Sequence, residues 1–117
     1  MTRIIHLSDL HFGRIRDDLT APLMAMINQL APDLVVISGD FTQRARHWQF
    51  AQAREFLRGI TAPTLSVPGN HDTPLDNIVV RLLWPWARYR RYIDRNLMPV
   101  WEKDLVRVAG VNSVNPF

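Results

Sequence analysis

Three short polar clusters carry residue types that bind metal ions, and they lie far apart in the chain. They are Ser8-Asp9-Leu10-His11, Ser38-Gly39-Asp40 and Pro68-Gly69-Asn70-His71-Asp72. Carboxylate, imidazole and amide groups are hard or borderline ligands, suited to Mn, Fe, Zn or Mg rather than to metals that prefer thiolates. The clusters therefore predict a metal site wherever the fold brings them together.

The spacing of these residues suits a pair of metal ions. Asp9 and His11 are two residues apart, so on an extended chain both side chains emerge on one side and can bind the same ion. Asp40 adds a carboxylate whose two oxygens can bridge two cations, and Asn70 offers a carbonyl oxygen to a second cation. Two ions about 3.5–4 Å apart can activate a water molecule and hold the oxygens of a phosphate for displacement.

His71 follows Asn70 directly and can approach the phosphoryl group or protonate the leaving oxygen. The next residue, Asp72, is a candidate for the group that orients the His71 ring. Gly39 and Gly69 suit positions where the backbone must turn tightly or let an ion or a phosphate come close.

Each cluster follows an apolar run of the kind that a buried parallel strand requires. The runs are residues 4–7, 34–37 and 64–67, and apolar residues at helical spacing between them predict helices at 18–30 and 46–57. Alternating strands and helices predict an α/β fold with a mainly parallel sheet and crossover helices. Ligands of such sheets bind at the carboxyl ends of the strands, where the three clusters would converge.

Size and composition describe one mildly basic domain. The chain has 117 residues, 47% of them hydrophobic, no cysteine, and thirteen arginines against one lysine for a formal net charge of +3. Without cysteine there is no disulfide framework and no thiolate metal site. We expect a cytoplasmic protein, because neither a signal peptide pattern nor an apolar run long enough to span a membrane is present.

In this order and at these strand ends, Asp9-x-His11, Gly39-Asp40 and Gly69-Asn70-His71-Asp72 resemble the calcineurin-like metallophosphoesterase family. The sequence around these motifs, at residues 7–13 and 39–42, is most similar to bacterial phosphodiesterase-like members of the family. The resemblance covers residues 4–72, with weaker support from residues 109–113. It implies the N-terminal half of an αββα sandwich.

The resemblance also implies a function and a role for each residue. It implies a phosphodiesterase or phosphomonoesterase in which two divalent metal ions activate a hydroxide that attacks a phosphate ester. Asp9 and His11 would bind the first metal, Asp40 would bridge both, and Asn70 would bind the second. His71 would be the catalytic acid or the group that stabilises the phosphate. Cyclic nucleotides, glycerophosphodiesters, nucleic acid ends and phosphoproteins all remain open as substrates.

One departure from the family pattern concerns histidines. Members of the family complete the two-metal site with further histidines after the Asn-His pair, whereas this chain has only His6, His11, His47 and His71. We therefore expect residues 1–117 to form a single domain that is truncated at its C-terminus. An alternative is an inactive half-domain, or one that a second chain or self-association completes.

Residues 78–101 combine tryptophans and tyrosines with arginines, and Pro85 and Pro99 interrupt them. We predict a broken helix here, followed by a strand at 105–111. The rings would pack on the core or form a flap over the metals. An alternative is a nucleic-acid or membrane-surface contact in which residues 81–101 take part. The arginines that would carry this contact are Arg88, Arg90, Arg91 and Arg95.

The remaining histidines and two arginines have simpler interpretations. His6 lies within the first strand, where we expect a packed or hydrogen-bonded neighbour of the core, and His47 at a helix start is expected on the surface. Arg44 and Arg46 are close enough to Asp40 to reach a substrate phosphate, but a solvated helix start is the favoured role for both.

Overall fold

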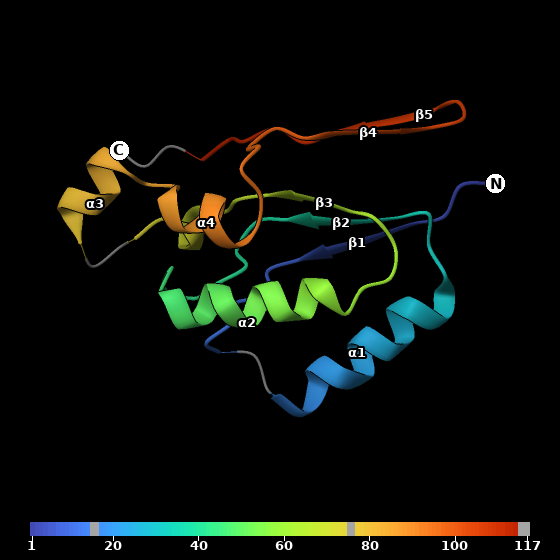
Figure 1. The fold of residues 1–117 in the computed structure, drawn as a ribbon, viewed down its shortest axis with the longest axis horizontal. Helices are drawn as coiled ribbons and strands as arrows, with labels where there is room; N and C mark the ends of the chain where they lie inside the picture. The colour runs from blue at the N-terminus through green and yellow to red at the C-terminus, as the bar shows by residue number, and fades with distance from the viewer. Residues whose placement is uncertain (15–16, 75–76, 115–117) are drawn as a thin grey trace.

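The computed structural model describes residues 1–14, 17–74 and 77–114, and a three-stranded parallel sheet lies at its centre (Figure 1). The strands lie in the order β1-β2-β3, and a helix makes each crossover between them. The predicted α/β class with a parallel sheet and crossover helices is confirmed. The elements in chain order are β1 (Ile4–Ser8), α1 (Asp17–Leu30), β2 (Leu34–Ser38), α2 (His47–Arg58) and β3 (Thr64–Val67).

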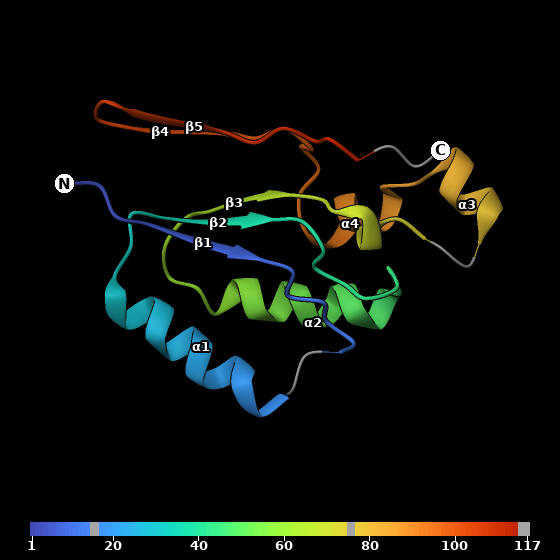
Figure 2. The same cartoon turned by 180° about the vertical axis from the view of Figure 1, so that it is seen from behind.

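Both crossover helices cover the same face of the sheet, as the two opposite views show (Figures 1 and 2). The core forms where this face meets the helices. Val35 and Ile37 of β2 are fully buried there, together with Ile27 of α1 and with Phe50 and Phe56 of α2. Alternate residues of a strand point to the same face, so this pair fixes which side of the sheet the helices cover.

A two-stranded antiparallel hairpin lies over the other side of the sheet, formed by β4 (Val100–Lys103) and β5 (Val106–Ala109). A side chain at Gly110 would collide with Val67 of β3, so the chain that follows the hairpin packs closely on the sheet. The expected strand at 105–111 is confirmed only as the shorter β5. The prediction of broken helix up to residue 101 is wrong for Val100 and Trp101, because pairing with β5 holds them extended.

Two short helices, α3 (Ile78–Leu83) and α4 (Ala87–Tyr92), confirm the predicted broken helix. They lie beyond the carboxyl ends of the three strands (Figure 1). Tyr89 of α4 is fully buried, with its ring centroid 5.8 Å from that of Phe41, so part of this segment packs on the core as expected. Among the described residues, no helix has the length and apolar character that crossing a bilayer demands.

The hydroxyl group of Tyr89 gives a stability prediction. It is buried and has no hydrogen-bond partner among the described residues. A buried polar group without a partner costs about 1–3 kcal/mol. Tyr89→Phe keeps the ring and removes the hydroxyl, so we expect the free energy of unfolding to rise by about 1 kcal/mol in urea denaturation.

Tyr92→Phe is the matched control, because the Tyr92 hydroxyl lies 3.2 Å from Nδ1 of His47 and has a partner to lose. We expect this variant to be unchanged or less stable. A loss of stability in Tyr89→Phe equal to that in Tyr92→Phe would show that the Tyr89 hydroxyl is satisfied in solution.

Candidate metal centre

The loops that follow β1 and β2 are joined by backbone hydrogen bonds that extend the parallel ladder beyond the strands. The amide of His11 donates to the carbonyl of Asp40 at 2.9 Å, and the amide of Phe12 donates to that of Phe41 at 2.8 Å. The amide of Gln43 donates back to the carbonyl of Phe12 at 3.0 Å. The first two polar clusters therefore occupy fixed positions relative to each other.

The carboxylate of Asp72 joins the third cluster to the second. It is fully buried and accepts hydrogen bonds from the amides of Phe41 at 3.0 Å, Thr42 at 2.9 Å and Gly69 at 3.0 Å. The hydroxyl of Thr42 also donates to it at 3.0 Å. The expectation that Asp72 orients the ring of His71 is therefore wrong, because the carboxylate oxygens of Asp72 accept hydrogen bonds from the two loops instead.

Burial raises the pKa of Asp72 to about 6, although the amides of Gly69, Phe41 and Thr42 act in the opposite direction. Moving a carboxylate out of water disfavours its charged form, whereas donors that point at the carboxylate favour it. At neutral pH the group is therefore ionised and can accept all of these hydrogen bonds.

Two glycines let the second and third loops approach each other. Gly39 has φ +81°, and a Cβ placed on it would lie 3.1 Å from the Cα of Gly69. A Cβ on Gly69 would collide with the backbone amide and the carboxylate of Asp40. Any side chain at position 69 would therefore displace the Asp40 carboxylate, which agrees with the close approach that the sequence predicts.

Three side chains from the three loops meet at this edge of the sheet. The ligand atoms of His11, Asp40 and His71 all lie within 4.8 Å of one another. Nε2 of His11 lies 3.7 Å from Oδ2 of Asp40 and 3.7 Å from Oδ1 of Asp9. The fold thus brings four of the five predicted site residues together.

The carboxylate of Asp40 and the backbone of the loop after it hold His71 in place. Oδ1 of Asp40 accepts from the amide of His71 at 2.9 Å, and the carbonyl of Gln43 lies 2.8 Å from Nδ1 of the ring. A carbonyl only accepts, so the Nδ1 of His71 carries a proton and Nε2 is the atom left for a ligand or for proton transfer. Sequence reasoning missed the role of Gln43, because its backbone carbonyl gives no signal in the residue pattern.

Asn70 begins the short 3-10 turn at Asn70–Asp72, and its side chain is exposed. It lines a hollow of about 370 Å³ together with Asp40, and residues near the C-terminus close the other side. Among them are Val111 and Ser113. Asn70 is therefore next to the cluster and accessible from the hollow.

These donor atoms fit a divalent cation. Ligand atoms of an ion bound at about 2.0–2.2 Å lie at most about 4.4 Å from each other, and both 3.7 Å separations at His11 fall within this limit. They are too long for hydrogen bonds, so Nε2 of His11 has no short contact with either carboxylate. Nδ1 of His11 is buried without a partner in the described chain.

The backbone is strained at this site. Of the six non-glycine residues with positive φ in the described chain, three belong to the predicted ligand set: Asp9 at 57°, His11 at 49° and Asp40 at 50°. Left-handed backbone costs about 1–2 kcal/mol for residues that carry a Cβ, and such conformations gather at functional sites. The strain supports a functional role for the three side chains.

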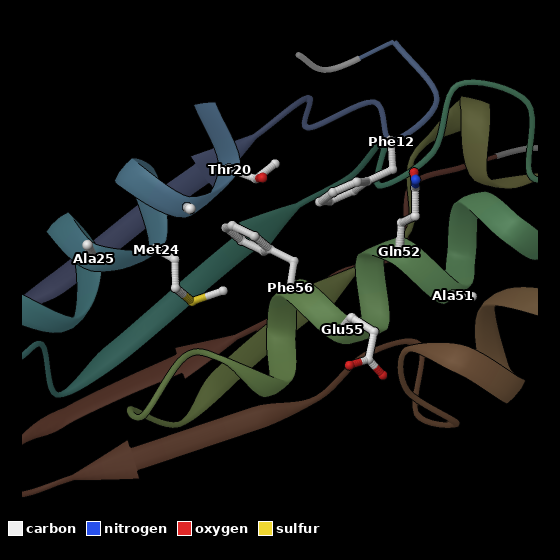
Figure 3. Close-up of a pocket in the computed structure, with 9 residues that line it drawn as sticks. Phe12, Thr20, Met24, Ala25, Ala51, Gln52, Glu55 and Phe56 are labelled. Carbon is white, nitrogen blue, oxygen red and sulfur yellow. The ribbon is translucent and has the colours of Figure 1, made fainter. Parts of the chain in front are cut away.

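A larger hollow of about 670 Å³ lies elsewhere, between α1 and α2 (Figure 3). Its lining is mostly apolar and includes Met24 of α1 and Phe56 of α2. Glu55 is the one carboxylate among its lining residues. We place the chemistry beside the smaller hollow, because Asp40 and Asn70 line it, whereas none of the predicted site residues lines the larger groove.

The remaining expectations have mixed outcomes. His47 is exposed at the start of α2, as predicted. His6 is hydrogen-bonded, with Nε2 2.5 Å from the hydroxyl of Ser38, but it is exposed and not part of the core. Arg44 and Arg46 are both exposed, as a solvated helix start requires.

Comparison with known proteins finds one matching protein family and several relatives. The family model for calcineurin-like phosphoesterases matches residues 2–116. A glycerophosphodiester phosphodiesterase of Enterobacter lignolyticus is 34% identical over 80 residues, which are 59% of this chain and 29% of that protein.

Two further relatives have similar extents. A probable cyclic nucleotide phosphodiesterase of Synechococcus sp. is 28% identical over 80 residues, 61% of this chain and 31% of that protein. A UDP-2,3-diacylglucosamine pyrophosphatase of Chlamydia muridarum is 33% identical over 73 residues, 60% of this chain and 22% of that protein. The chain matches less than a third of the length of each of these relatives.

Asp72 makes the stability of the chain depend on pH. Its pKa is raised from 3.8 to about 6 in the folded state, so the folded chain binds more protons than the unfolded chain between these values. Stability must therefore fall as pH rises through this window. Relative to Asp72→Asn, which cannot titrate there, we expect wild-type stability to fall by about 2 kcal/mol between pH 4 and pH 7.

Urea denaturation of both chains in the presence of a chelator measures this difference. The raised pKa of Asp72 would be contradicted if the stability of the wild type relative to Asp72→Asn stayed constant or increased as the pH rises from 4 to 7.

Proposed function

This chain belongs to the calcineurin-like phosphoesterase family, and we propose that it supplies the N-terminal ligand set of a metal-dependent phosphohydrolase. The observation that carries the proposal is the convergence of His11, Asp40 and His71 at the carboxyl edge of a parallel sheet. The reaction is the hydrolysis of a phosphodiester or phosphomonoester by water. The proposal concerns the whole site, of which residues 1–117 provide one part.

The proposed ligands divide between two divalent cations of the Mn, Fe, Zn or Mg class. Asp9 and His11 hold the first, Asp40 lies between the two, and Asn70 holds the second. Bound cations would supply charge stabilisation for the phosphoryl oxygens and a lower pKa for water. Asp40 is suited to the central role, because Oδ2 faces His11 while Oδ1 accepts from the amide of His71.

His71 acts on the substrate in this proposal. The carbonyl of Gln43 fixes the Nδ1 proton and the orientation of the ring, which leaves Nε2 to approach the phosphate. With both nitrogens protonated, His71 donates its Nε2 proton to the leaving oxygen as the bond between phosphorus and that oxygen breaks. Its ring is held near His11, with the two centroids 4.9 Å apart.

Besides phosphomonoesters, the proposed targets are phosphates with two links, as in a phosphodiester or a pyrophosphate. The names of the three relatives describe enzymes that act on glycerophosphodiesters, on cyclic nucleotides and on a pyrophosphate of diacylglucosamine. All of these substrates contain a phosphate with two ester or anhydride links. A matched segment of 73 to 80 residues is what this chain shares with these relatives, and the groups that select the rest of the substrate are left open.

Metal binding tests the ligand assignment without depending on turnover. Asp40→Asn keeps the shape of the side chain but removes its charge, so we expect Mn(II) affinity to fall at least about tenfold, which equals about 1.4 kcal/mol. His11→Ala should have a similar effect. His47→Ala is the control, since His47 lies at the start of α2 and is exposed.

Isothermal titration calorimetry with Mn(II) measures these affinities. Equal binding by wild type, Asp40→Asn and His11→Ala would reject the site, and so would an equal loss in His47→Ala.

Hydrolysis of bis(p-nitrophenyl) phosphate with Mn(II) tests the activity. We expect turnover that His71→Ala lowers about 10²–10⁴-fold while Mn(II) affinity is kept, because His71 acts on the leaving group. If self-association completes the site, the rate per chain should rise with protein concentration, and mixing with a chain that carries the missing histidines should do the same.

Folded, metal-binding protein without turnover under all of these conditions would support the alternative of an inactive half-domain. Turnover that His71→Ala leaves unchanged would contradict the role given to His71.

A further inference from the structure

Helix α3 exposes almost all of its apolar side chains. Ile78, Val79, Leu83 and Trp84 are between 57% and 69% exposed, and the helix has no buried residue. Scattered apolar residues are common on protein surfaces, but a contiguous apolar segment usually marks a contact site. Apart from Arg81, whose Nη1 donates to the hydroxyl of Thr73, residues 78–84 thus form an apolar surface at the end of the molecule where the strands finish (Figure 1).

Next along the chain, α4 and the residues after it present a basic surface. Arg90, Arg91 and Arg95 line one hollow of about 530 Å³, together with Ala87. None of the three arginines forms an ion pair with a carboxylate of the described residues. The Arg91 guanidinium lies 5.4 Å from the centre of the Tyr92 ring. Sequence analysis also includes Arg88 among the arginines of a possible surface contact. In the structure, however, Arg88 donates a hydrogen bond to the carbonyl of Ala45 at 3.0 Å, within the fold.

We propose that α3 and the Arg90–Arg91–Arg95 hollow together form a docking surface for an anionic lipid bilayer. The apolar residues of α3 would enter the interfacial layer, while the arginines contact the negatively charged headgroups. Helices α3 and α4 lie at the same end of the molecule in both views (Figures 1 and 2), so the proposal assigns both surfaces to one membrane.

A bilayer explains this combination better than a nucleic acid does. Single-stranded nucleic acids combine arginine contacts with stacking on aromatic rings, and Trp84 could provide one such ring. They offer nothing to cover the aliphatic Ile78, Val79 and Leu83, which a bilayer interface would bury. Tryptophan is itself enriched at membrane interfaces.

The dimensions indicate contact with the surface and not a span. Helix α3 has six residues, which correspond to about 9 Å of helix, whereas the hydrocarbon core of a bilayer is about 30 Å thick. The helix can therefore lie in the interfacial layer only. This surface is separate from the proposed ligands, so docking and metal binding can be tested independently.

Co-sedimentation with vesicles tests the proposal. We expect the chain to bind vesicles that contain phosphatidylglycerol, and to bind vesicles of phosphatidylcholine alone only weakly. The double variant Arg90→Gln and Arg95→Gln should bind anionic vesicles roughly 25-fold more weakly, because each cationic side chain near such a surface contributes about a fivefold attraction. The control, Arg58→Gln with Arg107→Gln, removes the same charge from arginines that pair with Glu55 and Glu102.

The apolar part of the surface has its own variants. Ile78→Ser with Leu83→Ser should weaken binding at least tenfold, whereas Leu19→Ser with Leu105→Ser, two exposed residues elsewhere, should not. Quenching of tryptophan fluorescence by brominated lipid should decrease in Trp84→Phe but not in Trp48→Phe, which removes a similarly exposed ring of α2.

Several results would overturn the proposal. They are no binding to anionic vesicles, equal binding to neutral vesicles, and equal losses in the test and control variants. Tighter binding to a single-stranded oligonucleotide than to anionic vesicles, lost in the same arginine variant, would assign the surface to nucleic acid instead. Mn(II) affinity should be unchanged in all of these variants, so failure of the docking surface leaves the proposed metal site standing.

Discussion

The arrangement of the candidate site depends on one buried charge. The Asp72 carboxylate accepts hydrogen bonds from the amides of Phe41, Thr42 and Gly69 and from the Thr42 hydroxyl. It thereby connects the loop that carries Asp40 to the loop that carries Asn70 and His71. Burying an ionised group disfavours folding, so the burial of Asp72 lowers stability at neutral pH while its hydrogen bonds to the two loops offset part of this cost.

The rest of the site follows from this connection and from the ladder between the first two loops. Hydrogen bonds from His11 to Asp40 and from Phe12 to Phe41 place the first loop on the second, and Asp72 adds the third. Apart from the Thr42 hydroxyl, the donors in these contacts are backbone amides. The side chain of Asp40 adds to them, because its Oδ1 accepts from the amide of His71 at 2.9 Å, while its Oδ2 faces Nε2 of His11.

Much of this architecture could be predicted from the sequence, because a parallel sheet leaves a strong pattern. Apolar runs before Asp9, Asp40 and Asn70 located the three strands, and the strand ends located the residues predicted to form the site. The carbonyl of Gln43 and the acceptor role of Asp72 could not be predicted, since backbone groups are common to all residues and their partners depend on tertiary contacts. Strand β4 was missed for the same reason, because its partner β5 determines its conformation.

The left-handed backbone at Asp9, His11 and Asp40 has a consequence for how such a chain can change. Glycine adopts this conformation without the steric cost that a Cβ brings, so replacing any of the three by glycine relieves local strain while it removes a proposed ligand. Selection for thermal stability alone would therefore favour the loss of these side chains. Their presence together in one chain agrees with the proposal that they bind a cation, and stability-guided redesign of this domain should leave these positions fixed.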